Sequence, residues 1–103
     1  YEFGGDGGVD FYLPNMSTVD VKMTTKRGYN LCRSKLTDTA DYYILAWPKN
    51  DHGVTLVGAI SGRRFNRDCE DMPTGVGHFI RHTDLRPMDT FKRRVDAMYM
   101  EST

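Results

Sequence analysis

The 103-residue chain lacks any long hydrophobic run. Its longest apolar stretch, residues 42–48, is far shorter than the ~20 residues that a membrane-spanning helix needs. It has only two cysteines, Cys32 and Cys69, and their spacing is typical of neither a disulfide framework nor a zinc motif. These absences argue against a helical membrane protein and a disulfide-rich secreted domain. They predict a cytoplasmic setting with no membrane partner.

An excess of charge of either sign is also lacking, since 14 Lys and Arg residues balance 14 Asp and Glu residues. The charges are nevertheless unevenly distributed. Residues 1–20 contain four carboxylates and no basic residue, whereas residues 21–37 contain five basic residues and no carboxylate. The basic residues are Lys22, Lys26, Arg27, Arg33 and Lys35. Carboxylates beside a basic strip are what a metal-dependent phosphodiesterase needs to hold cations and a phosphate backbone.

The remaining composition is ordinary, with 39% hydrophobic and 27% charged residues. A chain of this length can bury one modest core. No internal repeat or low-complexity tract is visible beyond glycines at positions 4, 5, 7 and 8. We therefore expect residues 1–103 to form a single domain.

Two neighbouring strand-like segments each contain an aspartate, Asp10 and Asp20. In the second segment, the apolar residues Val19, Val21 and Met23 alternate with Asp20, Lys22 and Thr24. Side chains two positions apart on a strand point to the same face, so Asp20 and Lys22 should project together. An acid-x-Lys tripeptide alone is expected about once by chance in a chain of average usage. The alternating context is therefore the informative part.

The pattern predicts five strands, a terminal helix and two less regular segments. The strands are expected near residues 8–13, 18–24, 41–47, 54–60 and 77–82. Apolar residues at helical spacing after Pro87 predict the terminal helix, namely Met88, Phe91, Val95 and Met98. Residues 61–73 are expected to form a loop with a short helical turn. Segment 26–40 is ambiguous, because near-helical spacing there competes with Gly28 and two threonines.

The order of these features resembles the PD-(D/E)xK, or restriction-endonuclease-like, nuclease superfamily. The resemblance rests on the glycine-rich turn, Asp10 and Asp20-Val21-Lys22, followed by the segments 41–46, 56–60 and 84–88. The last of these is similar to a closing segment in small phage and prokaryotic members. The resemblance implies an α/β fold with a central mixed β-sheet flanked by helices. It also implies a prokaryotic or phage-infected host cell.

By this resemblance, the chain is expected to be a metal-dependent nuclease that hydrolyses DNA phosphodiester bonds. Asp10, Asp20 and the Val21 carbonyl would bind Mg²⁺ or Mn²⁺, hard cations that prefer oxygen ligands. Lys22 would assist the attacking water or stabilise the phosphate. Further contacts to nucleic acid are expected from Thr24 and six basic residues. These six are Lys26, Arg27, Arg33, Lys35, Arg63 and Arg64.

The chain departs from the family pattern in one respect. Members usually begin with a helix that packs on the sheet and often contributes a glutamate, whereas Asp10 here follows only nine residues. Three explanations stay open: the sequence is a fragment, catalysis proceeds without the helix, or another chain supplies it. In the last case the partner would be a second copy in a homodimer or a different chain.

Other interpretations of the same residues remain. Asp20 and Lys22 could form only a surface salt bridge, which is worth roughly 0.2–1 kcal/mol, although this leaves Asp10 unexplained. The domain could be a non-catalytic DNA-binding or assembly module of the same fold, or a structural protein whose charged strips form an interface. A zinc site using His78 and His82 is disfavoured, because these residues would lie about 13 Å apart on a strand.

Overall fold

A computed structural model of the chain describes residues 9–49 and 53–102. These residues form a mixed α/β fold with two sheets and two α-helices. The elements in chain order are β1 (Phe11–Tyr12), β2 (Thr18–Met23), β3 (Leu31–Arg33), β4 (Tyr42–Pro48), β5 (Val54–Ser61), α1 (Gly62–Asp68), β6 (Glu70–Asp71), β7 (His78–Ile80), the 3₁₀ turn η1 (His82–Asp84) and α2 (Met88–Ser102).

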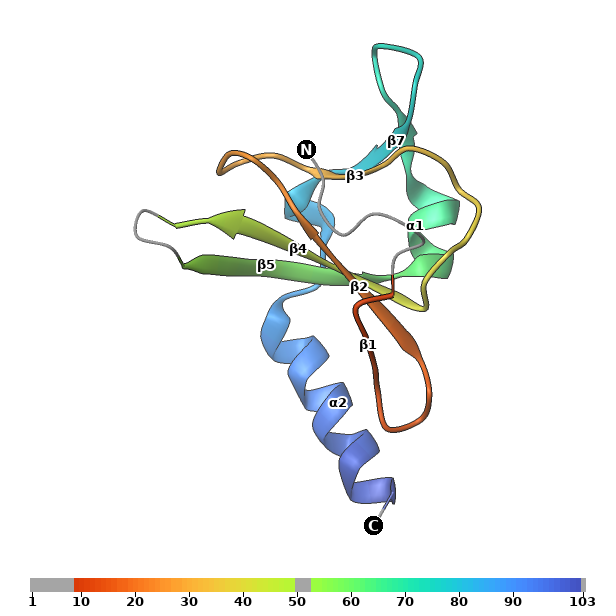
Figure 1. Cartoon of the computed structure of the whole chain (residues 1–103), viewed down its shortest axis with the longest axis vertical. Coiled ribbons are helices and arrows are strands. Elements are labelled where there is room, and N and C mark those ends of the chain that lie inside the picture. Colours follow the sequence, from red (N-terminus) through yellow and green to blue (C-terminus); the bar gives the residue numbers. More distant parts are fainter. Residues whose placement is uncertain (1–8, 50–52, 103) are drawn as a thin grey trace.

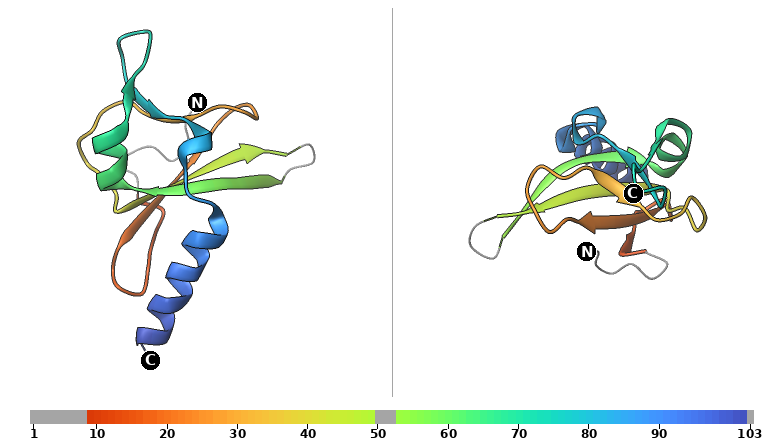
Figure 2. Two further views of the ribbon diagram at one scale, coloured as in Figure 1. Left: turned by 180° about the vertical axis from the view of Figure 1, so that it is seen from behind. Right: turned by 90° about the horizontal axis from the view of Figure 1, so that it is seen from above.

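The larger sheet has the strand order β1-β2-β4-β5, and the smaller one has the order β3-β7-β6. Figure 1 shows the smaller sheet and α1 above the four-stranded sheet and α2 below it. The view from behind in Figure 2 shows the same layering. The four-stranded sheet therefore forms the middle layer, with the smaller sheet and α1 on one face and α2 on the other (Figure 1).

Each face of the middle sheet buries a separate group of apolar side chains. On the upper face, Tyr43 and Leu45 of β4 pack with Phe65 of α1 and Ile80 of β7. On the lower face, Val19 and Ile44 pack against α2 through the residues that the helical spacing singled out: Met88, Phe91, Val95 and Met98. The terminal helix and its buried stripe are thus confirmed.

The parallel pairing of β2 with β4 determines where Asp20 lies. Hydrogen bonds between Thr18 and Asp41 fix the register of the two strands. Asp41 Oδ2 accepts hydrogen bonds from the backbone N–H of Thr18, at 2.8 Å, and from its hydroxyl, at 3.2 Å. The Asp41 N–H in turn donates to the Thr18 hydroxyl oxygen at 2.9 Å. These bonds tie the starts of the two strands together, so Asp20 lies beside Tyr43 and Lys22 beside Leu45.

The five expected strands are present, although the first and last are shorter than expected: β1 covers two residues of segment 8–13, and β7 covers three residues of segment 77–82. The glycine-rich turn lies outside the described residues. The helical option for segment 26–40 is wrong, because Leu31 and Arg33 are buried while Cys32 between them is exposed, a period of two that pairs with β7. In segment 61–73 the expected helical turn extends to the seven residues of α1.

Within the described part of the chain, no helix is both long and apolar enough to cross a bilayer.

Candidate active site

Asp10, Asp20 and Lys22 lie close together at the β1 side of β2. The Asp10 N–H donates to the Val19 carbonyl at 2.8 Å, and Asp10 Oδ2 accepts from the Val21 N–H at 2.6 Å. Asp10 is therefore bound to the residues on both sides of Asp20. Asp10 directly precedes the short β1 strand, and its carboxylate accepts the hydrogen bond that the Val21 N–H of β2 would otherwise donate to a neighbouring strand's backbone. The backbone of β2 thus fixes the Asp10 side chain beside Asp20.

Asp20 and Lys22 project from the same face of β2, as the alternation predicted. Lys22 Nζ lies 3.1 Å from Asp20 Oδ2, and the Asp20 side chain is only 4% exposed against 18% for Lys22. The second carboxylate oxygen, Asp20 Oδ1, is buried and has no hydrogen-bond partner among the described residues. A buried charged oxygen without a partner is costly, and a cation placed against it would remove that cost.

Burial raises the pKa of Asp20 above its ordinary value of 3.8. The hydrogen bond and charge of Lys22 lower the pKa of this carboxyl, whereas the adjacent Asp10 carboxyl raises it through side-chain hydrogen bonding and through its charge; burial is the largest of these effects, and the net pKa is raised. The ionised form of Asp20 is therefore less stable in the folded chain than in water. Binding of a divalent cation would favour that ionised form.

The donor set suits a hard cation that keeps some of its water. Two carboxylates converge here, and no cluster of three or more His, Cys, Asp or Glu side chains with metal-binding geometry occurs among the residues described. Mg²⁺ commonly uses one or two protein carboxylates together with waters and substrate phosphates. Val21 could contribute only its carbonyl oxygen, since hard cations take oxygen ligands, while its N–H holds Asp10 in place.

The two histidines of the disfavoured zinc site serve separate contacts. His78 Nδ1 lies 3.1 Å from Asp71 Oδ1, whereas the His82 ring packs edge-on against Trp47, with ring centroids 5.0 Å apart. His78 and His82 therefore engage different neighbours.

Three of the basic residues expected to contact nucleic acid after β2 are accessible, whereas the Thr24 hydroxyl is already engaged in a turn. Lys26, Arg27 and Lys35 are exposed, and Lys35 Nζ lies 4.0 Å from Asp38 Oδ2. The Thr24 hydroxyl donates to the Lys26 carbonyl at 2.8 Å. Thr24 therefore stabilises the turn, and its hydroxyl has only its acceptor capacity left for a ligand.

Arg33 requires a correction, because it is a buried structural residue and not a phosphate contact. It is 7% exposed. Its guanidinium donates to Asn66 Oδ1 at 2.6 Å and to the Thr37 carbonyl at 3.2 Å. The same group lies 4.5 Å from the ring centroid of Tyr43 and 5.0 Å from that of Phe65. Charge counting along the sequence missed this, since it cannot tell a buried arginine from an exposed one.

We expect Arg33→Met to lower the free energy of unfolding by about 3 kcal/mol. The substitution removes part-buried hydrogen bonds from a charged donor, worth about 1.5–3 kcal/mol, and the cation–π contacts. Urea denaturation followed by circular dichroism measures this loss. The exposed Arg27→Met is the matched control and should change stability by no more than about 0.5 kcal/mol. Equal effects of the two substitutions would contradict the assignment.

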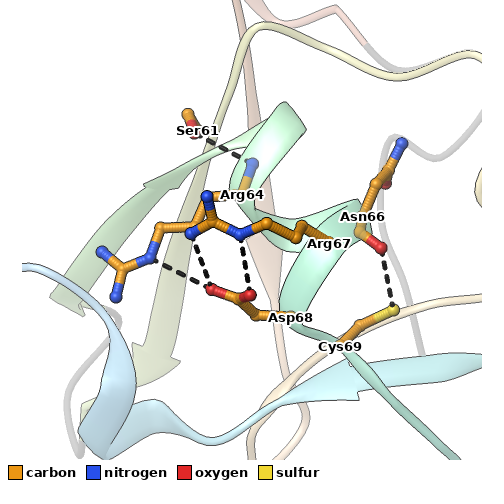
Figure 3. Close-up of polar contacts among 6 residues, drawn as sticks. All are labelled: Ser61, Arg64, Asn66, Arg67, Asp68 and Cys69. Atoms are coloured by element: carbon orange, nitrogen blue, oxygen red, sulfur yellow. Dashed lines mark hydrogen bonds and ion pairs between the residues drawn. The ribbon is translucent and has the colours of Figure 1, made fainter.

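Two of the three arginines of α1 pair with the same carboxylate. Figure 3 shows Arg64 and Arg67 converging on Asp68, with Arg64 Nε at 3.4 Å and Arg67 Nε at 2.9 Å from its oxygens. A pocket of about 150 Å³ beside Arg64 is lined partly by Asp68 and Asp84, which disfavours a phosphate there. Of Arg63 and Arg64, the two arginines predicted to contact nucleic acid here, Arg63 is exposed and is the better candidate.

Tyr29 is a residue that the sequence did not single out as a site candidate. The nearby Trp47 is partly buried against the upper core, and its Nε1–H donates to the Tyr29 carbonyl at 2.8 Å. Tyr29 itself is instead an exposed residue, with 48% of its surface accessible. The turn residues Gly28 and Asn30 on either side of Tyr29 are the sequence signal that could have identified a loop tip.

Comparisons with protein-family models, with curated proteins and with solved structures each find no match to this chain.

Proposed function

We propose that this chain is a divalent-metal-dependent deoxyribonuclease with a restriction-endonuclease-like fold. The observation that supports this best is the environment of Asp20. Its carboxylate is buried, one oxygen is paired with Lys22 and the other has no partner in the described residues. A carboxylate kept for stability alone would gain more from a second hydrogen bond, whereas a metal ligand needs that oxygen unoccupied.

Each of the three residues has a role in this proposal. Asp10 and Asp20, with the Val21 carbonyl, would hold Mg²⁺ or Mn²⁺. When bound, such a cation supplies Lewis-acid activation of the phosphate and of the attacking water. The Lys22 ammonium, held 3.1 Å from Asp20, stabilises negative charge on the phosphate or orients the water. Burial of Asp20 excludes water from this part of the site and strengthens these charge interactions.

A second candidate is a non-catalytic DNA-binding or assembly module of the same fold. It is favoured by the small number of ligands, since only two carboxylates converge in the described chain and Lys22 already neutralises one of them. Such a module would bind DNA equally well with and without Mg²⁺, which separates it from the nuclease.

The test is cleavage of labelled single-stranded, duplex and branched DNA in Mg²⁺ or Mn²⁺. We expect metal-dependent products from the wild type and a loss of at least about 10²–10³-fold in Lys22→Ala, typical of removing one charge-stabilising group. Lys92→Ala, an exposed lysine on α2, is the matched control and should cleave normally. DNA binding without any cleavage would favour the non-catalytic module, and equal cleavage by Lys22→Ala would contradict the role of Lys22.

A further inference from the structure

The loop between β2 and β3, residues 24–30, is held in place by contacts at both of its ends. At its start, the Thr24 N–H donates to the Ala46 carbonyl of β4 at 3.1 Å. At its end, Trp47 Nε1–H donates to the Tyr29 carbonyl and Asn30 Oδ1 accepts from the His82 N–H at 2.9 Å. Figure 1 shows this loop, which we call the basic loop, rising from β2 and returning above β4 to β3.

The exposed part of the basic loop combines two basic side chains with one aromatic ring. Lys26 and Arg27 are exposed, and no carboxylate occurs between residues 21 and 37. The turn at Gly28 has a φ of +92°, a conformation that L side chains rarely adopt. Tyr29 follows directly; its carbonyl is held by Trp47, and the residue is 48% exposed. An exposed ring on a fixed backbone loses little entropy when it stacks on a ligand.

The basic loop also lies within reach of the proposed site. Lys26 is four residues after Lys22, so their Cα atoms are at most about 14 Å apart. A strand whose phosphate lies at Lys22 can therefore continue to Lys26 and Arg27 within a few nucleotides. Bases in a duplex are stacked on one another, whereas the bases of a single strand are free to stack on an aromatic side chain.

We propose that the basic loop binds single-stranded DNA next to the cleavage site, with Lys26 and Arg27 on phosphates and Tyr29 stacked on a base. This inference rests on the proposed function for its substrate class and makes an unpaired strand the preferred substrate. Base stacking on an aromatic ring is tolerant of sequence, so no base preference is expected from Tyr29.

The experiment is fluorescence anisotropy of labelled oligothymidylate and of a duplex of equal length, in EDTA so that no cleavage occurs. We expect Tyr29→Ala to weaken single-strand binding by roughly 5- to 100-fold, and Tyr29→Phe to bind as the wild type does. Tyr99→Ala is the matched control, because this tyrosine is 59% exposed at the far end of α2. Lys26→Ala should lower the slope of log affinity against log salt by about 0.7.

The proposal is overturned if the wild type does not bind the single strand, or if Tyr29→Ala weakens single-strand and duplex binding equally or not at all. A parallel cleavage assay in Mg²⁺ and Mn²⁺ separates the two proposals. Cleavage without Tyr29-dependent binding removes the basic loop from the mechanism and keeps the nuclease. Tyr29-dependent binding without cleavage removes the nuclease and keeps the single-strand surface.

Discussion

Asp20→Asn should abolish metal-dependent cleavage while leaving the fold at least as stable as that of the wild type. The loss should be at least about 10³-fold, because the cation contributes several kcal/mol of transition-state stabilisation and each 1.36 kcal/mol is tenfold in rate. The amide keeps the shape of the side chain but removes its charge. Single-turnover cleavage with the preferred DNA substrate measures the loss.

The expected stability follows from the sign of the pKa shift. Because burial raises the pKa of Asp20, the folded chain binds the Asp20 proton more tightly than the unfolded chain does. This contribution to stability is fully present below the ordinary value of 3.8 and is lost as the pH rises through the raised folded value. At neutral pH without metal, the uncharged Asn avoids that loss. Asp20→Asn should therefore melt no lower than the wild type in EDTA, and its advantage should grow with pH over this window.

Addition of Mn²⁺ should reverse the order of the two melting temperatures, so that the wild type melts above Asp20→Asn. A ligand at 100 times its Kd stabilises the folded state by about 2.7 kcal/mol, and only the wild type keeps both carboxylates. Thermal melts with and without Mn²⁺ measure this difference. Asp96→Asn, an exposed carboxylate on α2, is the control and should respond to metal as the wild type does. A variant that melts well below the wild type in EDTA would show that pairing with Lys22 outweighs burial.

Gly62→Ala should cost about 3–4 kcal/mol, a large part of the roughly 5–15 kcal/mol that stabilises a domain of this size. Gly62 is the first residue of α1 and is buried. A Cβ at this position would lie 2.5 Å from Thr39 Cγ2 and would clash with the Ala40 carbonyl oxygen, a backbone atom. Making room for it also strains the 2.8 Å hydrogen bond from the Gly62 N–H to the Asp41 carbonyl.

The effect of Gly62→Ala should extend to the candidate site around Asp20. Asp41 also holds the start of β2 through Thr18, two residues before Asp20, so displacement of segment 39–41 disturbs the register of β2 against β4. Urea denaturation measures the cost, and Gly53→Ala is the matched control. A Cβ at Gly53 would meet the Lys49 side chain at an ordinary 3.4 Å, so this variant should change stability by no more than about 0.5 kcal/mol. Similar midpoints for the two variants would contradict the steric argument.

The periodic parts of the chain were predictable, whereas the parts determined by pairing between distant segments were not. The stripe from Met88 to Met98 predicted α2 and the face that it buries, because helical spacing is a local property. Segment 26–40 was ambiguous for the opposite reason. Its conformation depends on β7, some 47 residues further along, which pairs with Leu31, Cys32 and Arg33. Local propensity contains no information about that partner.

The sequence by itself determined the alternation that places Asp20 and Lys22 on one face of β2, because a strand has a period of two residues. Only the tertiary structure decided the environment of these groups. It brought Asp10 to the Val21 N–H, buried Asp20 with one oxygen unpartnered in the described chain, and placed Arg33 in the core. It also left Tyr29 exposed while Trp47 packs partly buried against the upper core. Burial and contacts between strands depend on which surfaces meet, and residue spacing along one chain does not specify that.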